Sequence, residues 1–293
     1  METSNPKKEK KDKIDATFAV NQFVETNGRT LAYRSIGKGM PIILANRFRG
    51  ILDYWDPAFL NALAKSFNVI TFDYSGFGLS TGEANRTILN FAQDVKDLAD
   101  ALNLKKIVVG GWSFGGMVAQ TVVTQFPELV SYAVLIGTNP PGANEGQIEP
   151  IFFERSRIMH YSIEDETILF FEPEAERSRQ AAVRSHERIA KRTEDLDVMI
   201  PPELWDTFTT GIQDYIADPY NSRAAILTTA IPMLVITGDH DLCFPAENWF
   251  KLVRTILNTQ IIVFPKAGHG PHHEHPKQVA RYIKNFIRYT EPA

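Results

Sequence analysis

The 293-residue sequence contains a single cysteine, Cys243, so it has no second thiol with which to form an internal disulfide. It also lacks any run of about 18 apolar residues, the length that a membrane-spanning helix requires. Basic residues are not in excess, since 31 lysines and arginines stand against 35 aspartates and glutamates, for a net charge of −4. These absences exclude a disulfide-stapled scaffold. They also predict no membrane span and no broad nucleic-acid-binding face.

Residues 1–15 form a basic segment in which five lysines lie between Lys7 and Lys13. Because no apolar stretch follows them, we expect no secretory signal and a cytoplasmic protein. A basic run of this kind can bind nucleic acid or direct a chain to the nucleus. We favour a solvated, disordered tail, because terminal segments without apolar anchors are usually poorly ordered.

The rest of the chain has the pattern of an α/β fold. Two β-rich runs flank Asn27-Gly28, a dipeptide that tolerates positive φ at both turn positions and predicts a hairpin. Continuous apolar runs follow, as expected of strands buried on both faces of a parallel sheet; they cover residues 41–45, 68–73, 106–110, 132–137, 232–237 and 260–264. Helix-like stretches separate them, at 60–67, 87–102, 118–126, 248–257 and 278–289. We therefore predict a mostly parallel sheet of about eight strands flanked by helices.

The alternation of strands and helices stops between Thr138 and Thr229. That segment reads as mostly helical, with expected helices at 148–161, 174–192 and 203–216. We predict a core formed by residues 16–138 and 229–293, with 139–228 inserted as a helical cap over the carboxyl edge of the sheet.

A candidate nucleophile follows one of the apolar runs. Gly111, Ser113 and Gly115 form the pattern G-x-S-x-G between a predicted strand and a predicted helix. A serine on such a sharp turn projects its hydroxyl above the sheet, and the flanking glycines avoid clashes with the strand and the helix. The alternative interpretation is a glycine-rich turn that only packs the helix on the strand.

A serine nucleophile needs a base, and the base needs an orienting acid. His269 follows a predicted strand at the edge where Ser113 emerges, and we predict that it is the base. Asp241 and Asp239 compete for the acid; we favour Asp241, which lies farther into its loop, and regard Asp239 as a turn former. Four histidines crowd into HGPHHEH at 269–275, so a metal cluster is the competing interpretation, although no helix would hold the ligands on one face.

Acyl chemistry also needs an oxyanion hole. One donor would be the N–H of Phe114, next after Ser113, and the other we assign to the N–H of Phe48 in the loop after the run at 41–45. Aromatic residues of the strand-end loops and cap suggest an apolar pocket, although aromatics at helical spacing are as often plain core. The substrate-binding candidates are Asn46, Arg47, Trp112, Phe152 and Trp205.

Four segments carry a resemblance: FDYSGFGLS at 72–80, GWSFGG at 111–116, TGDHDLCFP at 237–245 and AGHGPHHEHP at 267–276. Through them the chain resembles the α/β-hydrolase superfamily, and within it the helical-capped esterase and cofactor-free haloperoxidase-like branch, across essentially Phe18 to Tyr289. The resemblance implies a Ser113–His269–Asp241 triad with no metal and no organic cofactor.

The chain departs from the family where the family usually has His-Gly and this sequence has Asn46-Arg47. Asn46 could brace the loop through side-chain hydrogen bonds. Arg47 could contact an anionic substrate or simply point to solvent. Because arginine lacks the backbone freedom of the family's glycine, it also affects whether the N–H of Phe48 can act as the second oxyanion donor.

The expected function is hydrolysis of a carboxylic ester or lactone of a small, largely apolar substrate through an acyl-serine. Three alternatives stay open: another reaction on the same triad (perhydrolysis, C–C bond cleavage or a lyase step), a ligand receptor with slow turnover, and an interaction protein in which the lysine tail carries the function. The expected partner is a small molecule, with no nucleic acid and no membrane, and the oligomeric state is left open.

Overall fold

A computed structural model describes residues 15–292, so the predicted basic tail lies, up to residue 14, outside the described residues. Eight strands form one sheet in the order β1-β2-β4-β3-β5-β6-β7-β8, which confirms the predicted α/β fold. The strands are β1 (Gln22–Thr26), β2 (Arg29–Gly37), β3 (Met40–Ala45), β4 (Phe67–Phe72), β5 (Ile107–Trp112), β6 (Val130–Ile136), β7 (Met233–Gly238) and β8 (Thr259–Phe264).

The six strands from β3 to β8 run parallel, so their carboxyl ends meet at one edge of the sheet. Strands β5, β6 and β7 lie in the interior of the sheet and are buried along their whole length, which explains their continuous apolar sequences. Strand β8 is only partly buried because it has no neighbour on its outer side, so the prediction of burial on both faces is wrong for this strand.

The N-terminal strands form the predicted hairpin. Thr26 pairs with Arg29, and the two loop residues between them, Asn27 and Gly28, have φ of 48° and 76°. Positive φ at both positions matches the right-handed twist of the flanking strands. Strand β2 then pairs antiparallel with β4, which attaches the hairpin to the parallel sheet.

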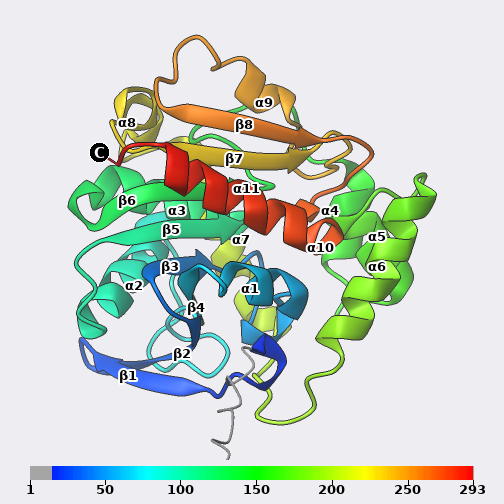
Figure 1. Cartoon of the computed structure of the whole chain (residues 1–293), viewed down its shortest axis with the longest axis horizontal. Coiled ribbons are helices and arrows are strands. Elements are labelled where there is room, and N and C mark those ends of the chain that lie inside the picture. Colours follow the sequence, from blue (N-terminus) through cyan, green and yellow to red (C-terminus); the bar gives the residue numbers. More distant parts are fainter. Residues whose placement is uncertain (1–14, 293) are drawn as a thin grey trace, which may run out of the picture.

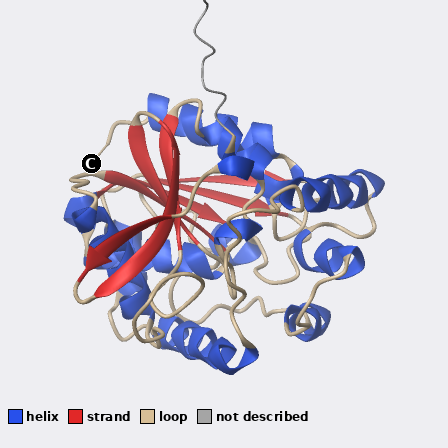
Figure 2. Ribbon diagram, turned by 90° about the horizontal axis from the view of Figure 1, so that it is seen from below, coloured by secondary structure: helices blue, strands red, loops and turns tan. Residues whose placement is uncertain are grey.

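Helices cover both faces of the sheet (Figures 1 and 2). Helix α1 (Pro57–Leu63) packs against α11 (Pro276–Tyr289) on one face, while α2 (Ile88–Ala101) packs against α3 (Phe114–Gln125) on the other. Polar caps fix where two of them begin: Asp56 accepts a hydrogen bond from Ala58 N–H, and Thr87 accepts one from Asn90 N–H. None of the helices in the described residues is long and apolar enough to cross a membrane.

The segment between β6 and β7 contains α4 (Pro150–Ser156), α5 (Ile163–Phe170), α6 (Glu176–Ile189), α7 (Trp205–Ala217) and α8 (Ser222–Thr228). Helices α5 and α6 lie beyond the carboxyl ends of β7 and β8 (Figure 1). Helix α8 instead packs against α3. The division into a core and a cap at residues 139–228 stays a prediction, and three helices of that range contact helices outside it: α6 contacts α1, α7 contacts α2 and α8 contacts α3.

Two parts of the helical pattern differ from expectation. The predicted helix over 248–257 is a short α9 (Glu247–Phe250) followed by turns, and the apolar side chains of Val253 and Leu257 are 57% and 70% exposed. Trp249, Leu252 and Ile256 of this segment are nevertheless buried in the core, so its turns pack there without a continuous helix. The structure adds α10 (Pro271–Glu274) and four short 3-10 helices, at Ala16–Phe18, Leu52–Tyr54, Pro127–Leu129 and Pro202–Leu204.

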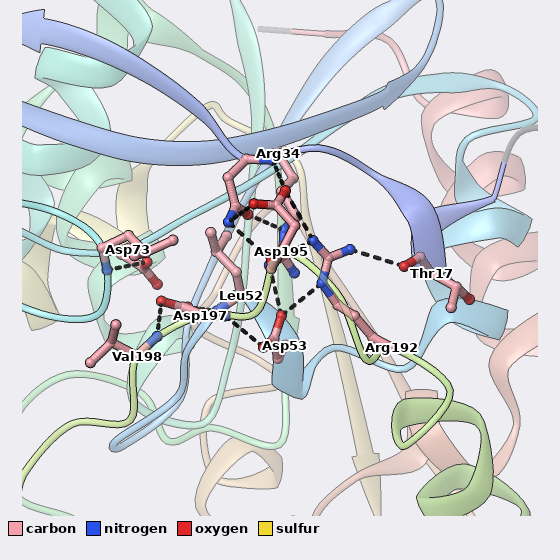
Figure 3. Close-up of polar contacts among 11 residues, drawn as sticks. Thr17, Arg34, Leu52, Asp53, Asp73, Arg192, Asp195, Asp197 and Val198 are labelled. Carbon is pink, nitrogen blue, oxygen red and sulfur yellow. Dashed lines mark hydrogen bonds and ion pairs between the residues drawn. The ribbon is translucent and has the colours of Figure 1, made fainter.

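An ion-pair network ties the segment after α6 to the core (Figure 3). The side chains of Arg34, on β2, and Arg192, after α6, both pair with Asp53, at 2.7 and 3.1 Å, and both are only 6% exposed. Asp197 accepts a hydrogen bond from Leu52 N–H at 2.7 Å. Buried charged groups of this kind are costly to separate, because each would be left without its partner.

A second carboxyl group lies against Asp197 in this network. Asp73, after β4, is 1% exposed and accepts a hydrogen bond from Leu79 N–H at 3.1 Å. Burial, and then the neighbouring charge of Asp197, raise the pKa of Asp73 well above its usual value. Asp73 therefore holds a proton in the folded state at pH values where it is ionised in the unfolded chain.

We expect Asp73→Asn to stabilise the protein more at pH 8 than at pH 5. Because the pKa of Asp73 is raised in the folded protein, this group contributes stability that is fully present below its pKa in the unfolded chain. That contribution is lost as the pH rises through its pKa in the folded protein. Asparagine does not titrate and can still accept from Leu79 N–H, so it avoids this loss. A difference of about 1 kcal/mol in the free energy of unfolding would shift the melting temperature by ~2–4 °C.

Thermal unfolding of both proteins at the two pH values measures this effect. Asp195→Asn is the matched control for removing a carboxylate from the same network, since the side chain of Asp195 is 51% exposed. If Asp73→Asn shifted the melting temperature equally at pH 5 and pH 8, this would contradict the claim that Asp73 is protonated in the folded state.

Candidate active site

Ser113 occupies the turn between β5 and α3, at φ 58° and ψ −120°. This backbone conformation is strained for any residue with a side chain. A Cβ at Gly111 would overlap the carbonyl of Gly115, and a Cβ at Gly115 would overlap the carbonyl of Ala45. The two glycines of the G-x-S-x-G pattern are therefore required by close backbone approach, as the sequence predicts.

His269 and Asp241 meet at the same edge of the sheet, in the loops after β8 and β7. Nδ1 of His269 lies 3.0 and 2.9 Å from the two carboxylate oxygens of Asp241. The N–H groups of Cys243 and Phe244 donate to Oδ1 of Asp241 at 2.8 and 2.9 Å, which fixes the carboxylate. An acceptor at Nδ1 leaves Nε2 as the free nitrogen of the ring.

Asp239, the alternative acid, does not contact His269. Its Oδ1 lies 2.6 Å from Nδ1 of His240 and accepts a hydrogen bond from Ala267 N–H at 3.3 Å. The geometry therefore favours Asp241 over Asp239, because only Asp241 reaches the imidazole.

Nε2 of His269 is buried and has no hydrogen-bond partner among residues 15–292. His269 and Ser113 line the same cavity, of about 160 Å³, although no hydrogen bond joins the Ser113 hydroxyl to this nitrogen. An unpartnered buried nitrogen is uncommon, because desolvation without a compensating hydrogen bond costs free energy. The imidazole therefore has a free nitrogen and lines the same cavity as the hydroxyl of Ser113.

The two predicted oxyanion donors also lie at this cavity, whose lining includes Phe48 and Phe114. Phe114 is the first residue of α3, so its N–H has no acceptor within the helix. Phe48 N–H makes no hydrogen bond to another residue of the described chain. The loop turns at Arg49, which has φ 48°, rather than at Arg47.

The cavity is apolar. Its walls come from α4, α5, α7 and the loop after β7, and they include Phe152, Phe153, Leu169, Phe170, Ile212 and Phe244. The rings of Phe152 and Phe244 lie 5.2 and 5.6 Å from the His269 ring. Such walls exclude water and suit apolar groups of a ligand.

The predicted substrate-binding residues separate into two groups. Phe152 and Arg47 line the cavity, whereas Asn46, Trp112 and Trp205 do not. Both polar groups of the Asn46 side chain are used, since it donates to Phe72 O at 2.8 Å and accepts from Trp55 Nε1 at 2.6 Å. Asn46 braces its loop, and the substrate contact predicted for it receives no support.

The two tryptophans also have other partners. Trp205 donates to Ile200 O at 2.9 Å and packs against the outer side of Phe48. Trp112 donates to His269 O at 2.8 Å and faces a second cavity. Trp205 therefore supports the wall of the Ser113 cavity from behind.

The histidine cluster is not arranged as a metal site. Within residues 15–292 no group of three or more histidine, cysteine or acidic side chains is placed to hold a metal ion. His272 and His273 are buried against Trp112, with ring centroids 4.6 and 4.7 Å away. Burial lowers the pKa of His272 well below its usual value and that of His273 to about 4, so both rings are neutral at pH 7.

A known protein family matches most of this chain. The family described as "alpha/beta hydrolase fold" matches residues 41–276. The chain belongs to this family. The α/β hydrolase is similar in structure to an alpha/beta hydrolase fold protein from Chitinophaga pinensis, with a TM-score of 0.84, 25% identity, and coverage of 94% of this chain and 100% of that one.

Two curated relatives have different names. The α/β hydrolase is 25% identical to proline iminopeptidase PfmaB of Pestalotiopsis fici, over 91% of this chain and 99% of the relative. It is 26% identical to a putative non-heme chloroperoxidase of Synechocystis sp., over 87% of this chain and 94% of the relative. The family is therefore shown, and its members are generally hydrolytic enzymes, but the relatives do not share one substrate.

Some lining residues of the α/β hydrolase were missed by sequence reasoning. Tyr161 and Phe244 both line the Ser113 cavity. Phe244 lies three residues after Asp241, and its N–H holds that carboxylate, so its place in the acid loop was an available signal. Tyr161 is the last residue of the helix predicted over 148–161, but α4 ends at Ser156, so the prediction is wrong there and Tyr161 lies in the loop between α4 and α5.

We expect the Ser113→Gly variant of this α/β hydrolase to be more stable than Ser113→Ala by about 1 kcal/mol. Both variants lack the hydroxyl, but only glycine adopts φ 58° with ψ −120° without strain. Elsewhere the order is usually the reverse, because glycine loses more chain entropy on folding. Urea denaturation of the two variants measures the difference, and a more stable alanine variant would contradict a strained turn.

Proposed function

We propose that this protein is a serine hydrolase that cleaves a carboxylic ester or lactone of a small, largely apolar substrate through an acyl-serine intermediate. The observation that carries the proposal is the His269 ring, held at Nδ1 by the buried Asp241 at 2.9 Å, with its other nitrogen unpartnered beside the cavity that Ser113 lines.

In the proposed reaction, His269 Nε2 takes the proton of the Ser113 hydroxyl as the oxygen attacks the substrate carbonyl. The negative charge that forms on the carbonyl oxygen is stabilised by the N–H groups of Phe114 and Phe48. Asp241 stabilises the imidazolium. The tetrahedral intermediate then releases the alcohol, which takes the proton from His269, and leaves an acyl-serine.

Water completes the cycle. His269 removes a proton from a water molecule, which attacks the acyl-serine. The second tetrahedral intermediate then collapses to the acid, and His269 returns the proton to the leaving Ser113 oxygen, which restores the hydroxyl. Phe152 and Phe244 flank the imidazole and limit the access of bulk water, which strengthens electrostatic interactions inside the site.

The apolar walls support an apolar acyl or alcohol group, and a cavity of about 160 Å³ supports a small one. The relatives support a hydrolytic function in general, while the names of the peptidase and the chloroperoxidase indicate that one such site serves more than one reaction. Activity on simple esters is therefore the direct test.

We expect Ser113→Ala to lower kcat/KM for p-nitrophenyl acetate and butyrate by at least ~10⁴-fold, because the nucleophile is removed. A fluorophosphonate should label the wild-type protein at Ser113 and leave the variant unlabelled, as measured by mass spectrometry, with circular dichroism to verify the fold. Ester turnover by the folded variant would refute the proposal. Labelling without any ester turnover would instead favour another reaction on the same three residues.

The two aspartates give a matched pair of variants. We expect Asp241→Asn to lower kcat by ~10⁴-fold, since the imidazole loses the group that fixes its tautomer. Asp239→Asn should change kcat by less than about threefold, because its carboxylate pairs with the exposed His240. Equal effects of the two substitutions on steady-state ester hydrolysis would contradict the assignment of Asp241.

A further inference from the structure

Arg47 is a buried cation without an anionic partner. The residue is 7% exposed, and its guanidinium makes one hydrogen bond, from Nη1 to Phe48 O at 2.8 Å. Its Nε has no hydrogen-bond partner, and no carboxylate in residues 15–292 lies within ion-pair distance of it. Burying a guanidinium without an anion is costly, so the site is incomplete as it stands.

Aromatic rings hold the guanidinium of Arg47 in position. Its central carbon lies 4.8 Å from the ring centroid of Phe170, 5.1 Å from that of Tyr54 and 5.4 Å from that of Trp112. The face of an aromatic ring attracts a cation, but it leaves the N–H groups at the edge of the guanidinium without acceptors. The rings therefore fix Arg47 without satisfying its hydrogen-bonding capacity.

The neighbouring Arg49 is a contrast within the same loop. It is also buried, but its guanidinium donates to the carbonyl oxygens of three residues, Ser156, Ile158 and Met159, at 3.0, 2.6 and 2.7 Å. It stacks on Trp205 as well, at 4.1 Å. Arg49 is satisfied by the cap, which identifies its role as structural and makes the unpaired Arg47 the exception.

Arg47 lies between two cavities. It lines the 160 Å³ cavity that holds Ser113 and His269, and also a second one of about 280 Å³ between the core and helices α5 and α6. Tyr161 and Phe170 line both as well. A substrate held at Ser113 can therefore reach the guanidinium with a second group.

None of the titratable groups that line the second cavity makes an ion pair with Arg47, although the charge of Arg47 acts on the carboxylate of Glu166, whose pKa is raised chiefly by burial. Glu166 is the one acidic residue that lines this cavity, and Oε2 of Glu166 lies 3.0 Å from Nδ1 of His186. The remaining titratable residues that line this cavity are Arg49, Tyr54, His160, Tyr161, His186 and His273. The position in front of Arg47 is thus open to an anion from outside the chain.

We propose that Arg47 binds a carboxylate group of the substrate, so that the ester or lactone cleaved at Ser113 belongs to a molecule that also carries a free carboxylate. The part of this inference that concerns cleavage at Ser113 rests on the proposed function. The part that concerns binding of a carboxylate rests on Arg47 alone. A planar guanidinium edge matches a carboxylate. A phosphate dianion fits less well, because the cavity offers no second unpaired cation and contains Glu166.

The kinetic test compares two esters that differ in charge, p-nitrophenyl butyrate and mono-p-nitrophenyl glutarate. We expect the wild-type protein to prefer the glutarate ester, and Arg47→Gln to lower the ratio of kcat/KM for glutarate over butyrate by about 100-fold. Arg47→Lys, which keeps the charge but not the planar fork, should give an intermediate ratio. An unchanged ratio in Arg47→Gln would overturn the inference.

Arg157→Gln is the matched control. Arg157 lines the Ser113 cavity but is 36% exposed, and it lies 3.8 Å from Asp206, so its removal takes the same charge from the cavity mouth. Because solvent screens exposed charges, the ratio should change by less than about threefold. A loss as large as that of Arg47→Gln would show general electrostatic attraction and overturn a specific site.

A binding test separates this inference from the proposed function. In Ser113→Ala, calorimetry should show benzoate or hexanoate binding at least about tenfold more tightly than benzamide or hexanamide, and adding Arg47→Gln should abolish this preference. If the carboxylates bind more tightly than the amides but the wild-type protein has no esterase activity, the inference holds and the proposed function fails.

Two results of this binding test would overturn the inference: neither carboxylate binding more tightly than its amide, or inorganic phosphate binding more tightly than both carboxylates. Near-UV circular dichroism verifies the fold of each variant, and Arg47→Lys replaces Arg47→Gln if the neutral variant does not fold. With Arg47→Lys, the preference for carboxylate over amide should fall without being abolished, and an unchanged preference would again overturn the inference.

Discussion

The hydrogen bond between His269 and Asp241 depends on the parallel pairing of β7 with β8. In that pairing Gly238 lies opposite Phe264, so the two loops leave the sheet at the same edge and at the same height. Strand β5 ends at this edge too, and the turn after it carries Ser113. Residues more than 120 positions apart in the sequence become neighbours because parallel strands align their carboxyl ends, and the proposed chemistry requires that alignment.

Much of this arrangement could be predicted from the sequence because it depends on local signals. Continuous apolar runs identified the strands, and the glycines around Ser113 identified a turn that only a closely packed strand and helix would need. His269 and Asp241 followed from their positions just after strands. The choice between Asp241 and Asp239 depends on a separation of two residues within one loop, and only the position of the imidazole decides it.

Other features could not be predicted, because they arise from contacts between distant segments. The burial of Arg47 results from rings in the loop before α1, in β5 and in α5, and no spacing in the sequence brings them together. Asn46 appeared as a candidate for substrate contact, yet its side chain bridges Phe72 and Trp55 inside the core. The sequence also predicted a helix over 248–257, but α9 ends at Phe250 and the side chains of Val253 and Leu257 are exposed.

The attachments of the segment between β6 and β7 are unequal in strength. On one side, buried ion pairs join Arg34 and Arg192 to Asp53. On the other side, the exposed side chain of Arg157, just after α4, reaches α7 through a 3.4 Å hydrogen bond to Thr209 and a 3.8 Å ion pair with Asp206. Phe153, which is 53% exposed and lines the Ser113 cavity, lies at that weaker side. The exposed lining residues of the Ser113 cavity, Ile148, Phe153 and Arg157, therefore all lie in α4 or beside it.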